Sequence, residues 1–484
     1  MIFNSFEFAF FIPIVFILYW FVFRLRHWQN LLIVIASYVF YGWWDWRFLF
    51  LIALTSFCSF ASGLLIEQFD NKRQWQKIVS ASNIVLNLFV LGIFKYFNFF
   101  VENFDGLIAS VFHCHLDWVT MEIVLPVGIS FYTFQALSYT IDVFQRKLPA
   151  TRDIVEFFAY ISFFPQLVAG PIERATNLLP QFQHDRRFDY AKAVDGCRQM
   201  LWGFFKKLVV ADNCASIINA SWSDFQNTPG FTLFFLGILF TFQIYCDFSG
   251  YSDIAIGCAR LFGFNLMRNF NYPYFSRSIP EFWRRWHISL TTWFRDYIYF
   301  PLGGSRCDKW KVIRNVYIVW GISGLWHGAN WTFVCWGLYH ASLLAIYNII
   351  GVNTKYDHVV AYEKLLPTIK ELLQIGLTFF LAVIGWIIFR AESMSQAVCY
   401  FSSMITNEFY DATKQHGGLF ACYGFFVLFI EWLQRDKQHA LQFPNSLTKE
   451  KYLPIRWAFY IGLIVLIFLL RDTSSEQQFI YFQF

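Results

Sequence analysis

Two histidines lie in sequence surroundings that would suit acid–base chemistry. His327 belongs to the glycine-rich string Gly321-Ile-Ser-Gly-Leu-Trp-His-Gly328, and His287 is the imidazole of a segment rich in tryptophan and arginine, residues 281–296. An imidazole with an ordinary pKa of about 6.5 takes up a proton near neutral pH. Neither histidine has a matched serine or cysteine nucleophile. The residues therefore favour a general base that acts on an incoming hydroxyl group.

Several familiar catalytic motifs are missing from the sequence. The chain contains no nucleotide P-loop and no GxGxxG, HExxH or G-x-S-x-G string. These motifs hold phosphates, a zinc ion or a serine nucleophile, so their absence argues against a nucleotide-driven pump, a zinc protease and a serine hydrolase. A thioester donor would suit the remaining histidine chemistry, because its thiolate leaving group has a parent pKa of about 8.5 and needs little acid help. We therefore expect direct acyl transfer between two bound substrates.

His327 lies in the longest stretch without charged residues. Residues 316–350 contain no Asp, Glu, Lys or Arg. As one helix this run would reach about 50 Å, whereas a bilayer core of about 30 Å needs only about 20 residues. We therefore expect a break at its glycines. Broken backbone is tolerated where it lines a wet cavity, and ionisable groups at that depth usually serve function, so His327 is predicted at the end of an intramembrane cavity.

Both histidines also have a purely structural interpretation. Gly324 and Gly328 form a small-xxx-small pair that would let another helix approach a buried, hydrogen-bonded His327. The segment around His287 has the composition of an interfacial anchor of tryptophan and arginine. His340 lies on the same uncharged run without such context and is predicted to be structural or interfacial.

The spacing within the second segment predicts which side chains accompany His287. On one helix Trp283, His287 and Thr291 share a face, whereas Arg285 and Asp296 point the other way. The supporting candidates, any of which would line the substrate site or polarise a carbonyl, are Trp326, Asn330, Arg295, Asp296, Asp247 and Asp253. Asp247 and Asp253 belong to the polar string 245–253, which either lines a cavity or ends a helix with capping side chains.

The composition identifies a polytopic membrane protein. Hydrophobic residues make up 57% of the 484, charged residues 15% and aromatic residues 22%, which is more apolar surface than a water-soluble chain could bury. The first apolar stretch, 8–23, follows Glu7 and lacks a small-residue cleavage site, so it is predicted to be a retained helix rather than a signal peptide. We expect an all-α protein that forms a single membrane domain over residues 1–484.

The loops of the first half predict the orientation. Taking apolar stretches 8–23, 30–42, 48–66, 78–101 and 121–143 as spans, alternate loops carry Arg24, Arg26, Lys72, Arg73, Lys77, Arg146, Lys147 and Arg152. The opposite loops hold Arg47. By the positive-inside rule the basic side is cytoplasmic and the N-terminus faces out. The net charge of +5 therefore needs no nucleic-acid partner to explain it.

Later stretches bring the expected count to about ten to twelve crossings. The further predicted spans are 231–246, 372–390, 417–433 and 457–470, together with the long uncharged run. Residues 190–215 and 279–300 mix charges with aromatic residues and are predicted to be interfacial or re-entrant helices. The string His113-Cys-His-Leu-Asp117 is the one ligand-like cluster; without a second cluster, no metal site is predicted.

Three strings carry a resemblance to a known family. Trp-Arg-Arg-Trp-His-Ile-Ser-Leu, Phe-Arg-Asp-Tyr-Ile-Tyr-Phe-Pro-Leu-Gly-Gly and Gly-Leu-Trp-His-Gly-Ala-Asn-Trp resemble the signature of the membrane-bound O-acyltransferase family. The resemblance spans essentially the whole chain. The strings that are similar to its alginate O-acetyltransferase branch are 1–8, 126–135, 164–172, 247–253 and 479–484.

The resemblance implies a ring of helices around a thinned centre, with His327 as the catalytic histidine at the bottom of a funnel and His287 near it. It implies transfer of an acetyl group from a cytoplasmic thioester, acetyl-CoA or another donor, to an extracytoplasmic polysaccharide such as alginate or peptidoglycan. It also implies a bacterial inner-membrane location, no bound cofactor and a partner, either an extracytoplasmic acetyltransferase or a glycan-synthesis complex. Three alternatives remain open: D-alanyl transfer to a teichoic-acid-type acceptor, a transporter or flippase of glycan precursors, and a non-catalytic scaffold for an envelope complex.

Overall fold

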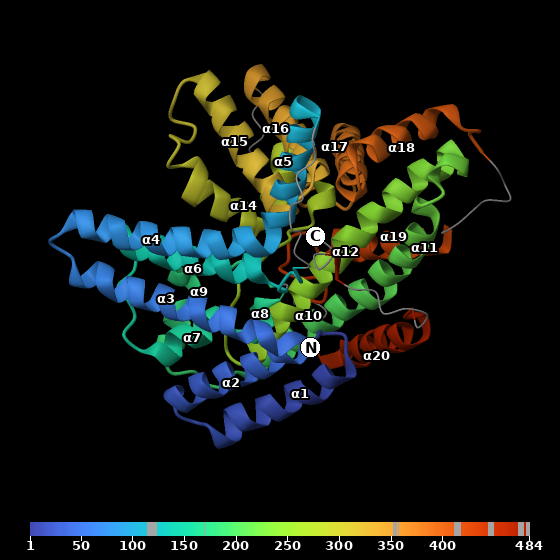
Figure 1. Cartoon of the computed structure of the whole chain (residues 1–484). Helices are drawn as coiled ribbons and strands as arrows, with labels where there is room; N and C mark the ends of the chain where they lie inside the picture. Colours follow the sequence, from blue (N-terminus) through green and yellow to red (C-terminus); the bar gives the residue numbers. More distant parts are fainter. Residues whose placement is uncertain are drawn as a thin grey trace. The chain divides into compact units, whose positions relative to one another are not determined.

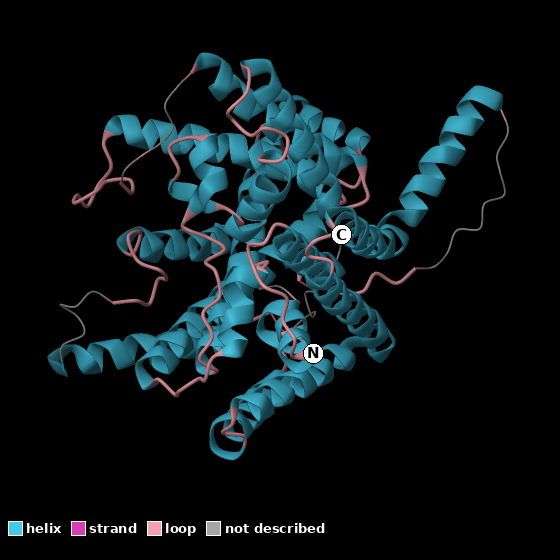
Figure 2. Cartoon of the chain, turned by 90° about the vertical axis from the view of Figure 1, so that its left-hand side faces the viewer, coloured by secondary structure: helices cyan, strands magenta, loops and turns pink. Residues whose placement is uncertain are grey.

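The computed structural model describes residues 1–113, 123–168, 170–351, 356, 358–410, 418–443, 450–472 and 479–480. Within these ranges the chain is built of helices and loops without a β-strand, as Figure 2 shows. The expected all-α architecture is therefore confirmed for the described part of the chain. Contacts between residues divide the chain into two compact units, one of residues 1–193 and 259–266 and one of residues 194–258 and 267–484. The prediction of a single domain stays a prediction.

The first unit contains nine α-helices among its described residues. Their bounds are α1 Phe6–Ile17, α2 Arg26–Asp45, α3 Leu49–Gln68, α4 Arg73–Leu91, α5 Phe97–Phe112, α6 Ile129–Phe144, α7 Ile154–Ser162, α8 Phe164–Leu167 and α9 Ala175–Gln183. Short segments join some of them: the π-helices Leu18–Val22 and Gly92–Tyr96 and the 3-10 helix Trp46–Phe48.

Polar side chains tie the helices of the first unit together. Helices α3, α4 and α6 pack against one another (Figure 1), and buried Asn83 on α4 donates to Thr140 on α6 at 2.7 Å and to Ser59 on α3 at 3.3 Å. Side-chain hydrogen bonds of this kind join helices in lipid, where there is no hydrophobic driving force between apolar faces. Asn83 thus links α4 to both α3 and α6.

The second unit holds the rest of the helices. Their bounds are α10 Tyr190–Phe204, α11 Asp212–Trp222, α12 Gly230–Leu261, α13 Ile279–Arg285, α14 Ile288–Phe294, α15 Lys309–His327, α16 Trp331–Ile350, α17 Ile369–Arg390, α18 Met394–Thr406, α19 Gly418–Leu433 and α20 Leu453–Leu470. Its short segments are the π-helices Phe205–Ala211 and Arg295–Tyr299 and the 3-10 helices Phe225–Asn227, Pro273–Phe275 and Glu450–Tyr452. The ends of α10 and α12 belong to the first unit.

Six helical stretches among the described residues are long and apolar enough to cross a membrane. They are Arg26–Gln68, Arg73–Phe112, Gly230–Leu261, Trp331–Ile350, Ile369–Arg390 and Leu453–Leu470, and shorter apolar helices occupy Phe6–Val22, Ile154–Leu167 and Ala421–Leu433. The multi-pass expectation is confirmed. The count of ten to twelve crossings and the ring around a funnel stay predictions.

Three predicted spans have wrong boundaries. The helix predicted at 121–143 starts only at Ile129, because residues 123–126 are not helical and residues 127–128 form a turn. The span predicted at 78–101 is part of a continuous helical stretch from Arg73 to Phe112 that includes a π-helix. The span predicted at 231–246 continues to Leu261. Hydropathy alone places the end of a helix at the first polar residues, but a helix continues wherever tertiary contacts satisfy those residues. The contacts that do so in α12 are described below.

Candidate functional site

The uncharged run breaks directly after His327, as predicted from its length. Helix α15 ends at His327, and Gly328 is extended with φ −170° and ψ 155°. Helix α16 then begins at Trp331 with Asn330 as its N-cap; the Asn330 side-chain oxygen accepts from the Thr332 backbone N–H at 3.0 Å. An asparagine at this position satisfies one of the orphan donors of the new helix. The break therefore places an imidazole at a helix end.

Helices α15 and α16 pack side by side (Figure 1) through glycines. A Cβ built on Gly324 would lie 2.3 Å from the Phe333 carbonyl oxygen, and one built on Gly337 would lie 2.3 Å from the Trp320 carbonyl oxygen. The predicted close approach at Gly324 is thus confirmed.

Gly324→Val is expected to destabilise the protein by about 1 to 3 kcal/mol or more, since the added carbons overlap backbone that cannot yield without separating the helices. Thermal unfolding in detergent measures this loss. Gly321→Ala is the matched control, because a Cβ at Gly321 meets nothing within 4 Å and alanine favours the helix by about 0.5 to 1 kcal/mol. Equal melting temperatures for the two variants would contradict the packing role of Gly324.

His327 is enclosed by aromatic rings. His327 is 4% exposed. Three aromatic rings meet its imidazole edge-on, with centroid separations of 5.0 Å for Trp326, 4.9 Å for Trp336 and 5.4 Å for Phe389. Edge-to-face rings at these separations form a well-defined wall. The imidazole is therefore held in one orientation away from bulk water.

His287 lies at a second helix break, where we had predicted one continuous helix. Helix α13 ends at Arg285, α14 begins at Ile288, and His287 between them has the left-handed φ of 43°. A non-glycine residue persists in this region only when its surroundings hold it there. The preceding loop supplies the hold: the Ile288 N–H donates to the Asn269 carbonyl at 2.9 Å.

The two imidazoles line the same cavity. It has a volume of about 60 Å³, and its lining residues are Trp283, Trp286, His287, Leu290, Thr291, Phe294, Val319, Trp320, Ser323 and His327. A single water needs about 10 to 15 Å³ by the same measure, so the cavity has room for a few water-sized groups. Trp326 contacts both histidines, with ring centroids 6.0 Å from His287 and 5.0 Å from His327. The structure thus brings together the two residues that the sequence singled out.

The sequence around the two histidines matches a known protein family. Residues 38–360, which include both histidine segments, match the model of MBOAT, the membrane-bound O-acyltransferase family. This match covers more than half of the chain. The chain belongs to the membrane-bound O-acyltransferase family. It is therefore a multi-pass membrane acyltransferase, and the transporter interpretation is not supported.

Curated relatives of this acyltransferase extend the match beyond the family segment. The chain is 41% identical over 408 residues to the probable alginate O-acetylase AlgI of Pseudomonas aeruginosa, which covers 84% of this chain and 75% of that protein. It is 32% identical over 402 residues to the peptidoglycan O-acetyltransferase of Helicobacter pylori, covering 78% and 73%. It is 30% identical over 281 residues to the teichoic acid D-alanyltransferase of Bacillus subtilis, covering 55% and 69%.

Three of the supporting candidates in this acyltransferase have other partners. Arg295 and Asp296 pair with each other, Nε to Oδ1 at 2.7 Å, and neither is among the residues that line the cavity. Asn330 caps α16 and donates to the Glu392 carbonyl at 2.8 Å. Their proposed part in polarising a carbonyl stays a prediction.

Asp247 and Asp253 lie inside α12 and do not end it, so the capping interpretation is wrong. Lys207 pairs with Asp247 at 2.8 Å, and Lys206 pairs with Asp253 at 2.6 Å. Each lysine is at most 2% exposed. Because each carboxylate has a buried counter-charge, the helix continues past both. Asp253 also lines a small cavity of about 10 Å³, which agrees with the alternative interpretation of this string.

Sequence reasoning did not single out the residues that support His287 and the two carboxylates. Asn269, the hydrogen-bond partner of the His287 Nδ1 atom at 3.0 Å, lies 18 residues before it. Lys206 and Lys207 belong to residues 190–215, which are predicted to form an interfacial or re-entrant helix, and this prediction gives neither lysine a role. Their burial could not be deduced locally, although two adjacent lysines beside apolar residues in the string Phe-Phe-Lys-Lys-Leu-Val-Val were a signal for it.

A metal ion has no evident site in the part of the chain that is described. Within those residues, no group of three or more His, Cys, Asp and Glu side chains is arranged to hold one. The cluster beginning at His113 falls, from position 114 onward, outside the described residues.

Proposed function

We propose that this acyltransferase is an O-acetyltransferase that moves an acetyl group from a cytoplasmic thioester to a hydroxyl group of an extracytoplasmic polysaccharide. The observation that carries the proposal is the cavity shared by His287 and His327. The relatives whose names include O-acetylase or O-acetyltransferase match 78 to 84% of the chain. An alginate-like exopolysaccharide and peptidoglycan are the acceptors that these names suggest.

The proposed chemistry uses His327 as the general base. The imidazole takes the proton of the acceptor hydroxyl while the hydroxyl oxygen attacks the carbonyl carbon of the thioester. The C–S bond of the thioester then breaks. The thiolate leaves with the electron pair of that bond. It takes a proton either from the imidazolium or from water, and in the second case the imidazolium returns its proton to water. Positioned general bases of this kind contribute about 10²- to 10⁴-fold to a rate.

The cavity favours an acetyl group over a D-alanyl group. Its wall is formed largely by tryptophan, phenylalanine and leucine, with the two imidazoles, Thr291 and Ser323 as polar members. Among the residues that the structure describes, no carboxylate lines this cavity. A D-alanyl group carries an ammonium, which is costly to bury without a partner of opposite charge. An uncharged acetyl group carries no such cost.

We further propose a location and a partner. The basic loops of the first half indicate a cytoplasmic face and an N-terminus on the opposite side of a bacterial inner membrane. The acetyl group would pass to an extracytoplasmic acetyltransferase or to a glycan-synthesis complex on that side. Purification in mild detergent from a native envelope is expected to bring such an enzyme with it, and recovery of the chain without any envelope enzyme would count against the partner.

Transfer from acetyl-CoA labelled in the acetyl group tests the function. The protein is reconstituted in proteoliposomes and supplied with envelope glycan and an envelope extract as a source of the partner. We expect labelled O-acetyl groups that mild alkali releases from the glycan. A parallel reaction offers labelled D-alanine on a carrier-protein thioester. Label from D-alanine alone would replace the acetyl proposal by the D-alanyl alternative, and label from neither donor would reject both.

A further inference from the structure

Asn269 makes the side-chain contact that fixes the orientation of His287. Its Oδ1 atom lies 3.0 Å from the His287 Nδ1 atom and accepts from the Ser289 hydroxyl at 2.9 Å and from the Ser289 backbone N–H at 3.4 Å. Its Nδ2 atom donates to the Ser252 hydroxyl at 3.2 Å. All four residues are at most 2% exposed.

This pattern determines which amide atom faces the histidine. The two atoms of an asparagine amide are told apart by their hydrogen-bond partners. A backbone N–H can only donate, so the atom that faces the Ser289 N–H must be the carbonyl oxygen. That oxygen is an acceptor, and His287 Nδ1 must therefore be the donor. The neutral imidazole then carries its proton on Nδ1 and its lone pair on Nε2.

The backbone around Asn269 is anchored at several points. The Ile288 N–H donates to the Asn269 carbonyl at 2.9 Å, and the Asn271 N–H donates to the Arg285 carbonyl at 2.9 Å. The Arg285 guanidinium in turn donates to the Asn271 carbonyl at 3.2 Å. The loop and the α13–α14 junction are thus bound to each other on both sides of His287.

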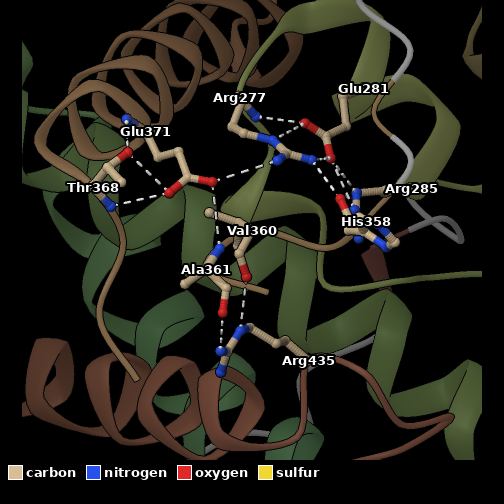
Figure 3. A network of polar contacts seen from close by, with 9 residues as sticks. All are labelled: Arg277, Glu281, Arg285, His358, Val360, Ala361, Thr368, Glu371 and Arg435. Atoms are coloured by element: carbon tan, nitrogen blue, oxygen red, sulfur yellow. Dashed lines mark hydrogen bonds and ion pairs between the residues drawn. The ribbon is translucent and has the colours of Figure 1, made fainter. Parts of the chain in front are cut away.

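A buried charge network clamps the same loop (Figure 3). Glu281 accepts from Arg277 at 3.0 Å and from Arg285 at 2.9 Å, and Arg277 also donates to the His358 carbonyl at 2.8 Å and pairs with Glu371 at 3.5 Å. In Figure 3 the Glu281 carboxylate lies between the two guanidinium groups. Paired and multiply hydrogen-bonded charges of this kind have defined geometry. The loop that carries Asn269 therefore has little freedom to move away from His287.

We propose that Asn269 is a positioning residue for acyl transfer: it holds the proton of His287 on Nδ1 and leaves Nε2 as the hydrogen-bond acceptor for a neighbouring hydroxyl group of the acceptor sugar. This inference rests on the proposed function. His287 would assist His327 by orienting the sugar through that second hydroxyl, so that the reacting hydroxyl keeps its proton for His327; an acceptor already locked in place loses less entropy when the substrate binds.

An uncharged partner suits this role better than a carboxylate. Burial lowers the pKa of His287 to about 3, so the ring is neutral at physiological pH. A carboxylate at position 269 would favour the imidazolium, which has no lone pair for a substrate. The side chain of Asn is nearly isosteric with that of Asp, so the two differ here chiefly in charge.

Titratable groups lie on two sides of His287, in the shared cavity and behind Asn269. The imidazole of His327, on α15, lines the same cavity, while α12 presents the ring of Phe248 with centroids 4.6 Å apart. Behind Asn269 the small cavity is lined by the charged or titratable side chains of Lys206, Tyr245, Asp253, Arg268, Tyr272, Glu431 and His439. Lys206 pairs with Asp253 at 2.6 Å and with Glu431 at 3.8 Å.

The first test is the pH profile of acetyl transfer. Asn269→Asp is expected to add an acidic limb at least one pH unit above that of the wild type, because His287 must lose a proton before it can accept a hydrogen bond. Asn269→Ala is expected to lower kcat about 10- to 100-fold with little change in donor KM. Asn315→Ala is the matched control: Asn315 is also fully buried but donates to the Leu302 carbonyl at 3.1 Å.

The second test needs no catalysis and therefore separates this inference from the proposed function. The pKa of His287 in the folded full-length chain can be measured from the exchange of the imidazole C2 hydrogen for deuterium. Mass spectrometry follows this exchange for each histidine as a function of pH. We expect the midpoint for His287 to rise by at least one unit in Asn269→Asp and to be unchanged in Asn315→Ala. An unchanged His287 midpoint in folded Asn269→Asp would overturn the inference. If Asn269→Asp fails to fold, a wild-type kcat in folded Asn269→Ala would overturn it equally.

Discussion

His327→Ala is expected to lower acetyl transfer at least about 100-fold, the greatest loss of any single change in the cavity, because it removes the proposed general base. Replacement by Gln separates two roles of the imidazole. A glutamine oxygen accepts a hydrogen bond but cannot carry the proton away at neutral pH. We therefore expect His327→Gln to be as inactive as His327→Ala, whereas His287→Gln retains part of the transfer. Labelled-acetyl transfer per folded molecule measures both.

His340→Gln is the matched control for these variants. His340 is another buried imidazole of the uncharged run; its Nδ1 atom accepts from the Trp283 indole N–H at 3.2 Å. We expect this variant to lose stability but to keep most of its transfer per folded molecule. Full transfer by folded His327→Ala would remove His327 from the chemistry. The opposite ranking, with His287→Gln inactive and His327→Gln active, would exchange the roles of the two histidines.

Lys207→Met is expected to destabilise the protein by about 3 to 5 kcal/mol, the largest effect on folding among the predictions. The Lys207 ammonium lies 2.6 Å from Asp212 and 2.8 Å from Asp247, and the residue is 1% exposed. These two carboxylates hold the pKa of Lys207 above its ordinary value. Methionine fills a similar volume without charge and leaves both carboxylates without this partner. Thermal unfolding in detergent and the yield of monodisperse protein measure the loss.

Arg146→Met is the control for the loss of an ion pair as such. Arg146 pairs with Asp70 at 2.6 Å, but both side chains are more than 60% exposed, and pairs of this kind contribute about 0 to 1 kcal/mol. Adding Asp212→Asn and Asp247→Asn to Lys207→Met is expected to restore part of the stability, because it removes the uncompensated charge. If Lys207→Met melts at the wild-type temperature, the lysine does not hold α12 as proposed.

Local pattern in the sequence was enough to predict the α15–α16 break. An uncharged run too long for one crossing must bend, and glycines lower the cost of bending, so a break near His327 followed from length and composition; which of the glycines carries the break did not. The membrane character followed in the same way, because the excess of apolar side chains is a property of the whole chain. The family strings placed His287 beside His327, and the shared cavity is consistent with that placement.

Only the tertiary structure decided what lies around these residues. The expected single helix through His287 is interrupted because Asn269 and Asn271, from a loop before α13, take over backbone hydrogen bonds at the junction. Helix α12 continues past Asp247 and Asp253 because Lys207 and Lys206, which precede them by 40 and 47 residues, neutralise them. A helical period relates residues three or four apart, whereas these partners are joined by folding across loops. The tautomer of His287 likewise depends on an amide distant in sequence, and no local pattern could have fixed it.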